Sequence, residues 1–213
     1  MIRIDFHRLR FLVVDDNVHM RRIVRQLLHG FGSREIYEAE DGAAGLEAFT
    51  AHIPDIVITD WAMPIFDGIE LTKTIRQPGT NANPFVPIIM LSGHSEKKRV
   101  IEARDAGVTE FLAKPIAAKL LYERILCVVL SPRPFIQTKN FFGPDRRRFV
   151  NPKYAGPERR KGKDGSRVIP VAALDSTLQL RTRQRHDDKL DGTTPASPPD
   201  DARPPLAASG TSG

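Results

Sequence analysis

Residues 11–17 read Phe11-Leu12-Val13-Val14-Asp15-Asp16-Asn17, so four consecutive apolar side chains are followed directly by two carboxylates and an amide. An uninterrupted apolar run of this length is typical of a strand that is buried on both faces of a sheet. From His19 to His29 the apolar side chains return at helical spacing. The stretch therefore predicts a buried strand, a polar turn and an amphipathic helix.

The same alternation continues to about residue 130. The expected strands cover residues 11–14, 35–39, 55–59, 86–91 and 108–112. Helices are expected at 19–29, 42–51, 69–76 and 116–130, and a further helix, capped by Ser95, is expected to end at residue 106. Apolar strands that alternate with helices predict a doubly wound α/β fold with a five-stranded parallel sheet covered on both faces. In such a sheet, ligands and chemistry gather at the carboxyl ends of the strands.

Reactive side chains follow four of these strands, and they are Asp15, Asp16, Asp60, Ser92 and Lys114. Three carboxylates at one edge repel each other, so positive charge is needed among them. Lys114 supplies one charge, and hard oxygen ligands suit Mg²⁺. A carboxylate in this setting can attack phosphorus, with Ser92 and Lys114 stabilising the phosphoryl oxygens.

Four segments together resemble the response-regulator receiver domain of bacterial two-component signalling. They are Leu12-Val13-Val14-Asp15-Asp16-Asn17, Ile58-Thr59-Asp60-Trp61-Ala62-Met63-Pro64-Ile65-Phe66-Asp67-Gly68, Ile89-Met90-Leu91-Ser92-Gly93-His94 and Phe111-Leu112-Ala113-Lys114-Pro115. The resemblance covers residues 8–130 and implies a (βα)5, flavodoxin-like fold.

The resemblance also implies a phosphorelay function. Asp60 matches the phosphoacceptor, which takes a phosphoryl group from a histidine kinase or a histidine phosphotransfer protein. Asp16, Asp60 and the backbone carbonyl of Ala62 match direct Mg²⁺ ligands, and Asp15 matches a residue that acts mainly through water. The resulting expectation is a signalling protein that switches its protein contacts and catalyses only its own phosphorylation and dephosphorylation.

Three further residues have counterparts in the same family. Ser92 and Phe111 match the pair that switches position on phosphorylation, and Lys114 matches the lysine of the catalytic site. Pro115 matches a proline that follows a cis peptide bond, which is mostly a property of bonds before proline.

An enzyme of another class remains as an alternative. A magnesium-dependent phosphatase with an aspartyl nucleophile also uses Asp, Lys and Ser side chains. It usually needs a second acid two residues after the nucleophile, and that position is Ala62. It also needs a cap domain, for which residues 1–130 have no spare length.

The net charge of +6 is concentrated behind this domain. Residues 1–130 carry 16 basic and 17 acidic side chains, whereas residues 131–163 carry 10 basic and 2 acidic ones. This basic tail contains Phe141-Phe142-Gly143-Pro144-Asp145-Arg146-Arg147-Arg148 and, 13 residues later, Tyr154-Ala155-Gly156-Pro157-Glu158-Arg159-Arg160-Lys161. Both copies follow one pattern, which we call the aromatic-x-Gly-Pro-acid-Arg-Arg repeat.

Three interpretations of the basic tail are open. It can be a solvated linker, a segment that docks on the receiver or on an unknown downstream protein, or a nucleic-acid-binding output. Paired arginines grip carboxylates or phosphates bidentately, which makes Arg146, Arg147, Arg159 and Arg160 the candidate partner contacts. No helix-turn-helix or zinc pattern supports sequence-specific DNA binding, so nucleic acid is the weaker expectation.

Residues 164–213 are expected to be largely disordered, because prolines stand there among Ala, Ser, Thr and Asp. The single cysteine, Cys127, cannot form an internal disulfide, and its apolar neighbours predict a buried thiol. No apolar run approaches the roughly 20 residues that a membrane span needs. A signal peptide is also not indicated, which together predicts a cytoplasmic protein without a membrane partner.

Overall fold

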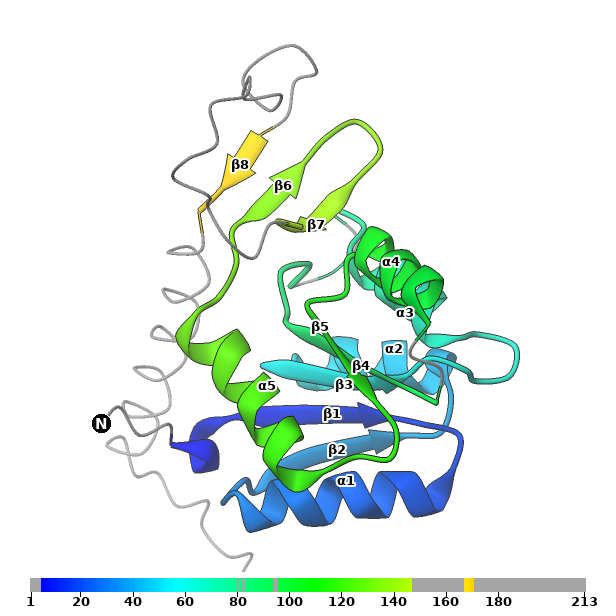
Figure 1. Ribbon diagram of the computed structural model, residues 1–213, viewed down its shortest axis with the longest axis vertical. Coiled ribbons are helices and arrows are strands. Elements are labelled where there is room, and N and C mark those ends of the chain that lie inside the picture. Colours follow the sequence, from blue (N-terminus) through cyan, green and yellow to red (C-terminus); the bar gives the residue numbers. More distant parts are fainter. Residues whose placement is uncertain (1–4, 80, 82, 94–95, 147–166, 171–213) are drawn as a thin grey trace, which may run out of the picture. The chain divides into compact units, whose positions relative to one another are not determined.

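The structure is a computed structural model and describes residues 5–79, 81, 83–93, 96–146 and 167–170. Its strands up to residue 130 are β1 (Arg10–Val14), β2 (Glu35–Ala39), β3 (Ile56–Asp60), β4 (Ile88–Ser92) and β5 (Glu110–Ala113). The helices are α1 (Val18–Gly30), α2 (Gly42–His52), α3 (Gly68–Ile75), α4 (Lys97–Ala106) and α5 (Ala118–Leu130), and a 3₁₀ turn, η1 (Phe6–Arg8), precedes β1. Along the chain, each of these strands is followed by one helix, as Figure 1 shows.

The five strands form one parallel sheet in the order β2-β1-β3-β4-β5. The chain steps outward from β1 to β2 and then returns past β1 to β3, so the strand order reverses between β1 and β3. This topology confirms the predicted doubly wound α/β fold. It also places the point of reversal, where ligands collect in such sheets, between the ends of β1 and β3.

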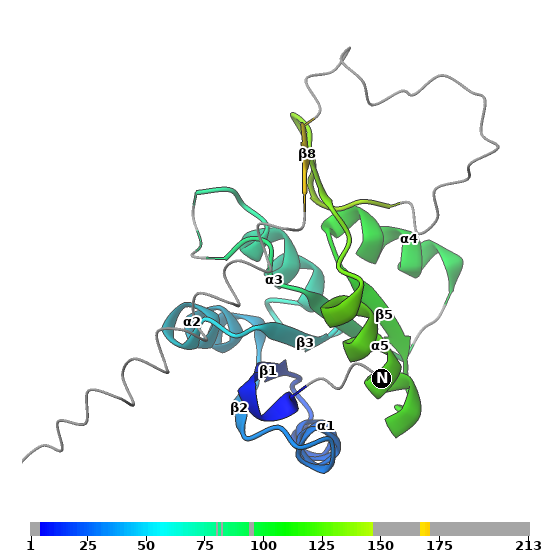
Figure 2. The same ribbon diagram turned by 90° about the vertical axis from the view of Figure 1, so that its left-hand side faces the viewer.

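Helices cover both faces of this sheet (Figure 2). On one face, side chains of α1 and α5 pack with apolar residues of β1, β3, β4 and β5, as Val24, Leu28, Leu121 and Ile125 do. On the other face, Phe49 of α2 and Leu71 and Ile75 of α3 pack against β1, β3 and β4. The inner strands are apolar throughout because neither of their faces meets water.

The helix starts next to the sheet edge are fixed by side-chain caps. The Oδ1 atom of Asn17 accepts hydrogen bonds from the backbone N–H groups of His19 and Met20 and thereby starts α1. Asp67 and Glu70 form a capping box at the start of α3. Such caps typically contribute about 1 kcal/mol each. They hold the loops after β1 and β3 in place.

A second, three-stranded sheet follows α5. It contains β6 (Phe135–Gln137), β7 (Phe142–Pro144) and β8 (Arg167–Ile169) in the antiparallel order β7-β6-β8. No strand was expected here, because these strands are three residues long and show no apolar periodicity. Strand β8 lies within residues 164–213, so the largely disordered state expected for that segment does not hold at Arg167–Ile169. Residues 147–166 and 171–213 lie outside the described residues, so the disorder expected for most of the C-terminal part stays a prediction.

The expectation that Cys127 carries a buried thiol is wrong, because Cys127 is exposed on α5. Its apolar neighbours Ile125 and Val128 are buried, whereas the Cys127 thiol lies 3.9 Å from Oε1 of Glu110, the first residue of β5. No helix among the described residues has both the length and the apolar character that crossing a bilayer requires.

Candidate functional site

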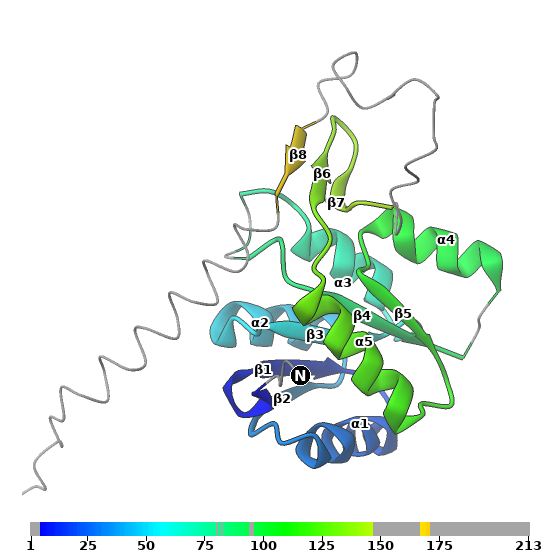
Figure 3. The same cartoon turned by 60° about the vertical axis from the view of Figure 1, so that its left-hand side comes forward.

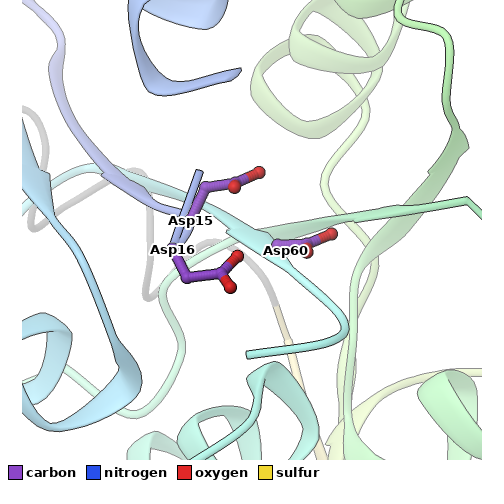
Figure 4. Close-up of side chains that lie close together, drawn as sticks. All are labelled: Asp15, Asp16 and Asp60. Atoms are coloured by element: carbon purple, nitrogen blue, oxygen red, sulfur yellow. The ribbon is translucent and has the colours of Figure 1, made fainter. Parts of the chain in front are cut away.

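Three carboxylates meet where the strand order reverses. Asp15 and Asp16 follow β1 directly, and Asp60 is the last residue of β3. One oxygen from each of the three carboxylates lies within 4.8 Å of the others. Figure 4 shows the three side chains extending to the same side from the ends of their strands. The predicted convergence of Asp15, Asp16 and Asp60 is therefore confirmed.

Lys114 supplies the positive charge that this cluster needs. Its Nζ atom lies 2.9 Å from Oδ2 of Asp15 and 2.9 Å from Oδ1 of Asp60. The backbone N–H of Lys114 donates to the carbonyl oxygen of Ser92 at 2.7 Å, which ties the end of β5 to the end of β4. The peptide bond between Lys114 and Pro115 is cis, as the sequence predicts.

Burial decides the electrostatics of the site. Asp15 and Asp60 are only 1% and 7% exposed, whereas Asp16 is exposed. Burial raises the pKa of Asp60, and the hydrogen bond from Lys114 offsets only part of this effect. Burial by itself lowers the pKa of Lys114, but its hydrogen bonds to Asp60 and Asp15 outweigh this, so that pKa is raised. Lys114 is therefore a cation at neutral pH.

Arg21 positions the two acids after β1, a role that its place in the sequence does not indicate. Its Nη1 atom donates to the carbonyl oxygen of Asp15 at 2.6 Å and lies 3.4 Å from that of Asp16. The backbone N–H of Asn17 also donates to Oδ1 of Asp15 at 2.9 Å. Arg21 reads in the sequence as one of several basic residues on the polar face of α1. Arg21 differs from the other basic residues of α1 because its side chain extends back to the end of β1 and bonds the backbone there.

Gly68 is a second residue whose importance the sequence understates. A Cβ atom at this position would overlap the backbone carbonyl oxygen of Asp60. That oxygen also accepts a hydrogen bond from the Thr59 hydroxyl at 3.0 Å. The sequence marks Asp67-Gly68 as a turn signal, but the structure shows that the glycine lets the start of α3 approach Asp60.

The remaining predicted site residues lie in or directly after the strands β3, β4 and β5. Ser92 ends β4, is 1% exposed and stands one residue beyond Leu91, the register partner of Asp60. Ala62 is exposed in the loop after β3, two residues from Asp60. Phe111 is partly buried, and its ring meets that of Trp61 edge-on at 6.5 Å between centroids. The structure thus links Phe111, through Trp61, to the loop that follows Asp60.

The donor set of the acidic cluster suits a hard divalent cation. The Lys114 ammonium is bonded to one carboxylate oxygen of Asp15 and one of Asp60, while the carboxylate of Asp16 is exposed to solvent. Three carboxylates with one accessible side leave room for water, which Mg²⁺ retains in most of its protein sites. Among the described residues, these three acids form the one group that could hold a metal ion.

Of the four arginines expected to contact a partner, the structure describes Arg146. Its side chain pairs with Asp105 of α4 at 3.3 Å. Arg147, Arg159 and Arg160 lie outside the described residues. Phe135, one of the aromatic side chains that suggested nucleic-acid stacking, is 3% exposed. The Phe135 ring is therefore packed inside the protein and is not accessible for stacking on a nucleic-acid base.

Comparisons with known proteins agree with this arrangement. The profile of the family described as response regulator receiver domain matches residues 11–126. The chemotaxis protein CheY-3 of Vibrio cholerae is 37% identical over 117 residues, which cover 55% of this chain and 88% of the relative. The chemotaxis protein CheY of Pseudomonas aeruginosa is 34% identical over 117 residues, covering 55% of this chain and 93% of the relative.

Solved structures of receiver-type proteins also superimpose on the chain. Vibrio cholerae CheY4 matches with a TM-score of 0.53 and 29% identity, over 57% of this chain and 98% of that protein. The CheY of Borrelia burgdorferi, solved with CheX, BeF₃ and Mg²⁺, matches with a TM-score of 0.51 and 28% identity, over 56% and 88% of the two chains. With its family profile covering more than half of the sequence, this chain belongs to the response regulator receiver domain family.

Proposed function

We propose that the protein is a phosphorelay receiver in which Asp60 accepts a phosphoryl group from a histidine kinase or a histidine phosphotransfer protein. The observation that carries this proposal is the position of Lys114, which bonds Asp15 and Asp60 at once within an acidic cluster at the sheet edge. An aspartate held next to a fixed cation, at the end of a buried strand, is set up for phosphoryl transfer.

The chemical step is an in-line displacement at phosphorus. An oxygen of the Asp60 carboxylate attacks the phosphorus of the donor phosphohistidine, the new O–P bond forms and the N–P bond breaks. The imidazole leaves with the electron pair of that bond and takes up a proton. The Lys114 ammonium neutralises a phosphoryl oxygen, and the Ser92 hydroxyl donates a hydrogen bond to another.

A magnesium ion completes the site in this proposal. Asp16, Asp60 and the carbonyl of Ala62 would be its direct ligands, and Asp15 would act through water. When bound, Mg²⁺ neutralises charge on the phosphoryl oxygens. The exposed carboxylate of Asp16, the close approach of the three acids and the description of a related CheY with Mg²⁺ support this assignment.

The output is a change of protein contacts and not the turnover of a separate substrate. Ser92 and Phe111 shift toward the phosphoryl group and carry the change to the surface of α4, β5 and α5. Phe111 already contacts Trp61 next to the acceptor, which supports this route. The residue two positions after Asp60 is Ala62, which lacks the acid that a phosphatase of the aspartyl-nucleophile type requires.

Labelling by acetyl phosphate tests the proposal. The full chain with Mg²⁺ should gain one phosphoryl group by intact mass, and hydroxylamine should remove it, because acyl phosphates are labile to that nucleophile. Asp60→Asn should abolish the mass gain while the circular dichroism spectrum stays unchanged.

The matched control is Glu40→Gln, which alters an exposed acid that follows β2 at the same sheet edge. It should be labelled as the parent chain is. Full labelling of Asp60→Asn, or a label that resists hydroxylamine, would overturn the assignment of Asp60.

A further inference from the structure

The first copy of the aromatic-x-Gly-Pro-acid-Arg-Arg repeat is seated on the receiver itself. Strands β6 and β7 form a hairpin beside the end of α4 (Figures 1 and 3). Phe135 and Phe142 of this hairpin pack around Phe85, which lies in the loop before β4. The three ring centroids are 5.1 to 5.5 Å apart. Mutual packing of three aromatic rings gives this contact an apolar centre.

A buried arginine, Arg76, packs against the hairpin from the receiver side. The guanidinium of Arg76 lies 5.2 Å from the centroid of the Phe135 ring. It donates to the carbonyl oxygens of Gly107 and Pro84 at 3.0 and 2.7 Å. Burial lowers the pKa of Arg76 to about 9. The hairpin thus rests on a group that also fixes the turn between α4 and β5.

Three residues that the two repeat copies share in kind, namely the aromatic, the glycine and the first arginine, have contacts in this copy. A Cβ atom at Gly143 would lie 3.0 Å from the Cα of Gly107, so a larger residue fits there only if the two backbones separate by a few tenths of an ångström. Arg146 covers the Phe141 ring at 4.5 Å and pairs with Asp105 at 3.3 Å. The aromatic, the glycine and the first arginine therefore act together on the last turn of α4.

A second arginine of the tail reaches the first residue of β5. Arg133 donates from Nη1 to the carbonyl oxygen of Asp145 at 3.1 Å, and its Nη2 lies 3.5 Å from Oε1 of Glu110. Glu110 is 3% exposed and begins a strand of four residues. The residue directly after that strand is Lys114. Arg124 of α5 pairs with the other oxygen of Glu110 at 3.3 Å. One end of β5 is thus held by α5 and the tail together, and the other end carries the cation of the acceptor site.

Phe111 stands between these two ends. It lines a cavity of about 100 Å³ whose walls include Arg133 and Arg146 of the tail and Ala103 of α4. Its ring also contacts Trp61, directly after Asp60. A change in the position of Phe111 therefore alters the packing next to the docked tail.

We infer that the first repeat copy is an intrachain docking segment whose occupancy of the α4–β5 surface opposes phosphorylation of Asp60. The inference rests on the proposed function, since it concerns the regulation of the same site. The ion pairs with Asp105 and Glu110 hold α4 and β5 in the arrangement in which Lys114 bonds the free Asp60 carboxylate. A rearrangement of α4 and β5 breaks these pairs, so docking and phosphorylation weaken each other by the same factor.

The second copy of the repeat is a natural comparison. Tyr154 and Arg159 repeat the aromatic and the arginine that meet in the first copy, but Ala155 replaces the anchoring Phe142. The second copy therefore lacks the ring that Phe142 contributes to the cluster of the first copy. Arg159→Glu is therefore a control with the same charge change at the same motif position as Arg146→Glu.

Hydrogen exchange of the full chain, measured without a phosphodonor, tests the docking. Arg146→Glu should speed amide exchange in residues 135–144 by about threefold, because it turns an exposed ion pair into a repulsive one. Phe142→Ala should speed it about tenfold or more, since the ring cluster is lost. Arg159→Glu should leave exchange unchanged, and Asp105→Arg combined with Arg146→Glu should restore it.

Labelling by acetyl phosphate tests the coupling on the same proteins. The half-saturating concentration should fall in both single variants, further in Phe142→Ala than in Arg146→Glu, and the double variant should recover the parent value. Unchanged exchange in both Arg146→Glu and Phe142→Ala would overturn the docking. Faster exchange with an unchanged or higher half-saturating concentration would overturn the coupling and leave Asp60 as acceptor. If no variant and no parent is labelled, the proposed function fails, while the exchange data still decide the docking.

Discussion

The Nζ atom of Lys114 lies 2.9 Å from Oδ1 of Asp60, which joins the end of β5 to the end of β3 across β4. The same atom lies 2.9 Å from Oδ2 of Asp15 at the end of β1. One ammonium group therefore neutralises two buried carboxylates on two strands. Stability and chemistry at this edge depend on the same side chain.

Replacing Lys114 with Met should destabilise the fold and abolish labelling by acetyl phosphate. Without the ammonium, two buried carboxylates face each other unpaired, and the free energy of unfolding should fall by about 2 kcal/mol at neutral pH. Urea unfolding with a chelator measures this loss. Millimolar Mg²⁺ should recover much of it, because the cation takes over the neutralisation.

Lys119→Met is the control for this change, since Lys119 is exposed at the start of α5. It should unfold within about 0.5 kcal/mol of the parent chain. An equal loss in both variants would contradict the role given to Lys114.

The pKa of Asp60 predicts a pH-dependent stability. Burial raises this pKa above its ordinary value, so the unfolded chain loses the Asp60 proton at lower pH than the folded chain does. Ionised Asp60 therefore costs folding free energy above the raised pKa, and that cost disappears as the pH falls toward the ordinary value near 3.8. Asp60→Asn removes the ionisation altogether.

In chelator, Asp60→Asn should be more stable than the parent chain at neutral pH, and the difference should shrink as the pH is lowered through the raised pKa. Urea unfolding at several pH values measures it, with Glu40→Gln as the comparison. A difference that grows toward acid pH would show that the pKa of Asp60 is depressed.

The sequence predicted the sheet and the site because both depend on local patterns. Apolar runs marked the five strands, and each candidate residue followed one of them, so the parallel topology alone brought Asp15, Asp60 and Lys114 to one edge. The supporting contacts of Arg21 and Gly68 carry no such pattern. Their importance depends on distances between a helix and a strand end, and these appear only in three dimensions.

The basic tail shows a different limit of sequence reasoning. Its charge and aromatic residues left a linker, a docking segment and, as the weaker expectation, a nucleic-acid binder open. The structure favours docking for the first repeat copy, because Phe135 and Phe142 pack on Phe85 and Arg146 pairs with Asp105. The sequence alone does not show whether an aromatic side chain packs on a nucleic-acid base or on another aromatic side chain.

Arg21→Met should weaken Mg²⁺ binding. Arg21 fixes the backbone carbonyls of Asp15 and Asp16, so its loss frees the loop that presents two of the three acids. We expect the dissociation constant to rise about tenfold, as is typical when a residue that orients metal ligands is removed. Titration of Mg²⁺ against the fluorescence of Trp61, the single tryptophan, measures it.

The neighbouring Arg22→Met is the matched control, since Arg22 is exposed on the same helix. Both variants remove one positive charge from α1, so a purely long-range electrostatic effect would tighten Mg²⁺ binding in both. A loss of affinity in Arg21→Met alone is the outcome that the hydrogen bonds require.

Gly68→Ala should damage the acceptor site with little effect on the rest of the fold. The new Cβ would overlap the carbonyl oxygen of Asp60, so either α3 or the end of β3 must move. Displacing a reacting group by about 1 Å costs a rate factor on the order of 100. Labelling of Gly68→Ala by acetyl phosphate should therefore slow by about that factor, while the circular dichroism spectrum keeps its helical signal.

Gly30→Ala separates this effect from a general cost of replacing glycine. Gly30 ends α1, and a Cβ there meets no atom within 4 Å. Because alanine favours helix more than glycine does, Gly30→Ala should be neutral or slightly stabilising, and its labelling rate should equal that of the parent chain. If Gly68→Ala were labelled as fast as Gly30→Ala, the approach of α3 to Asp60 would not control the acceptor geometry.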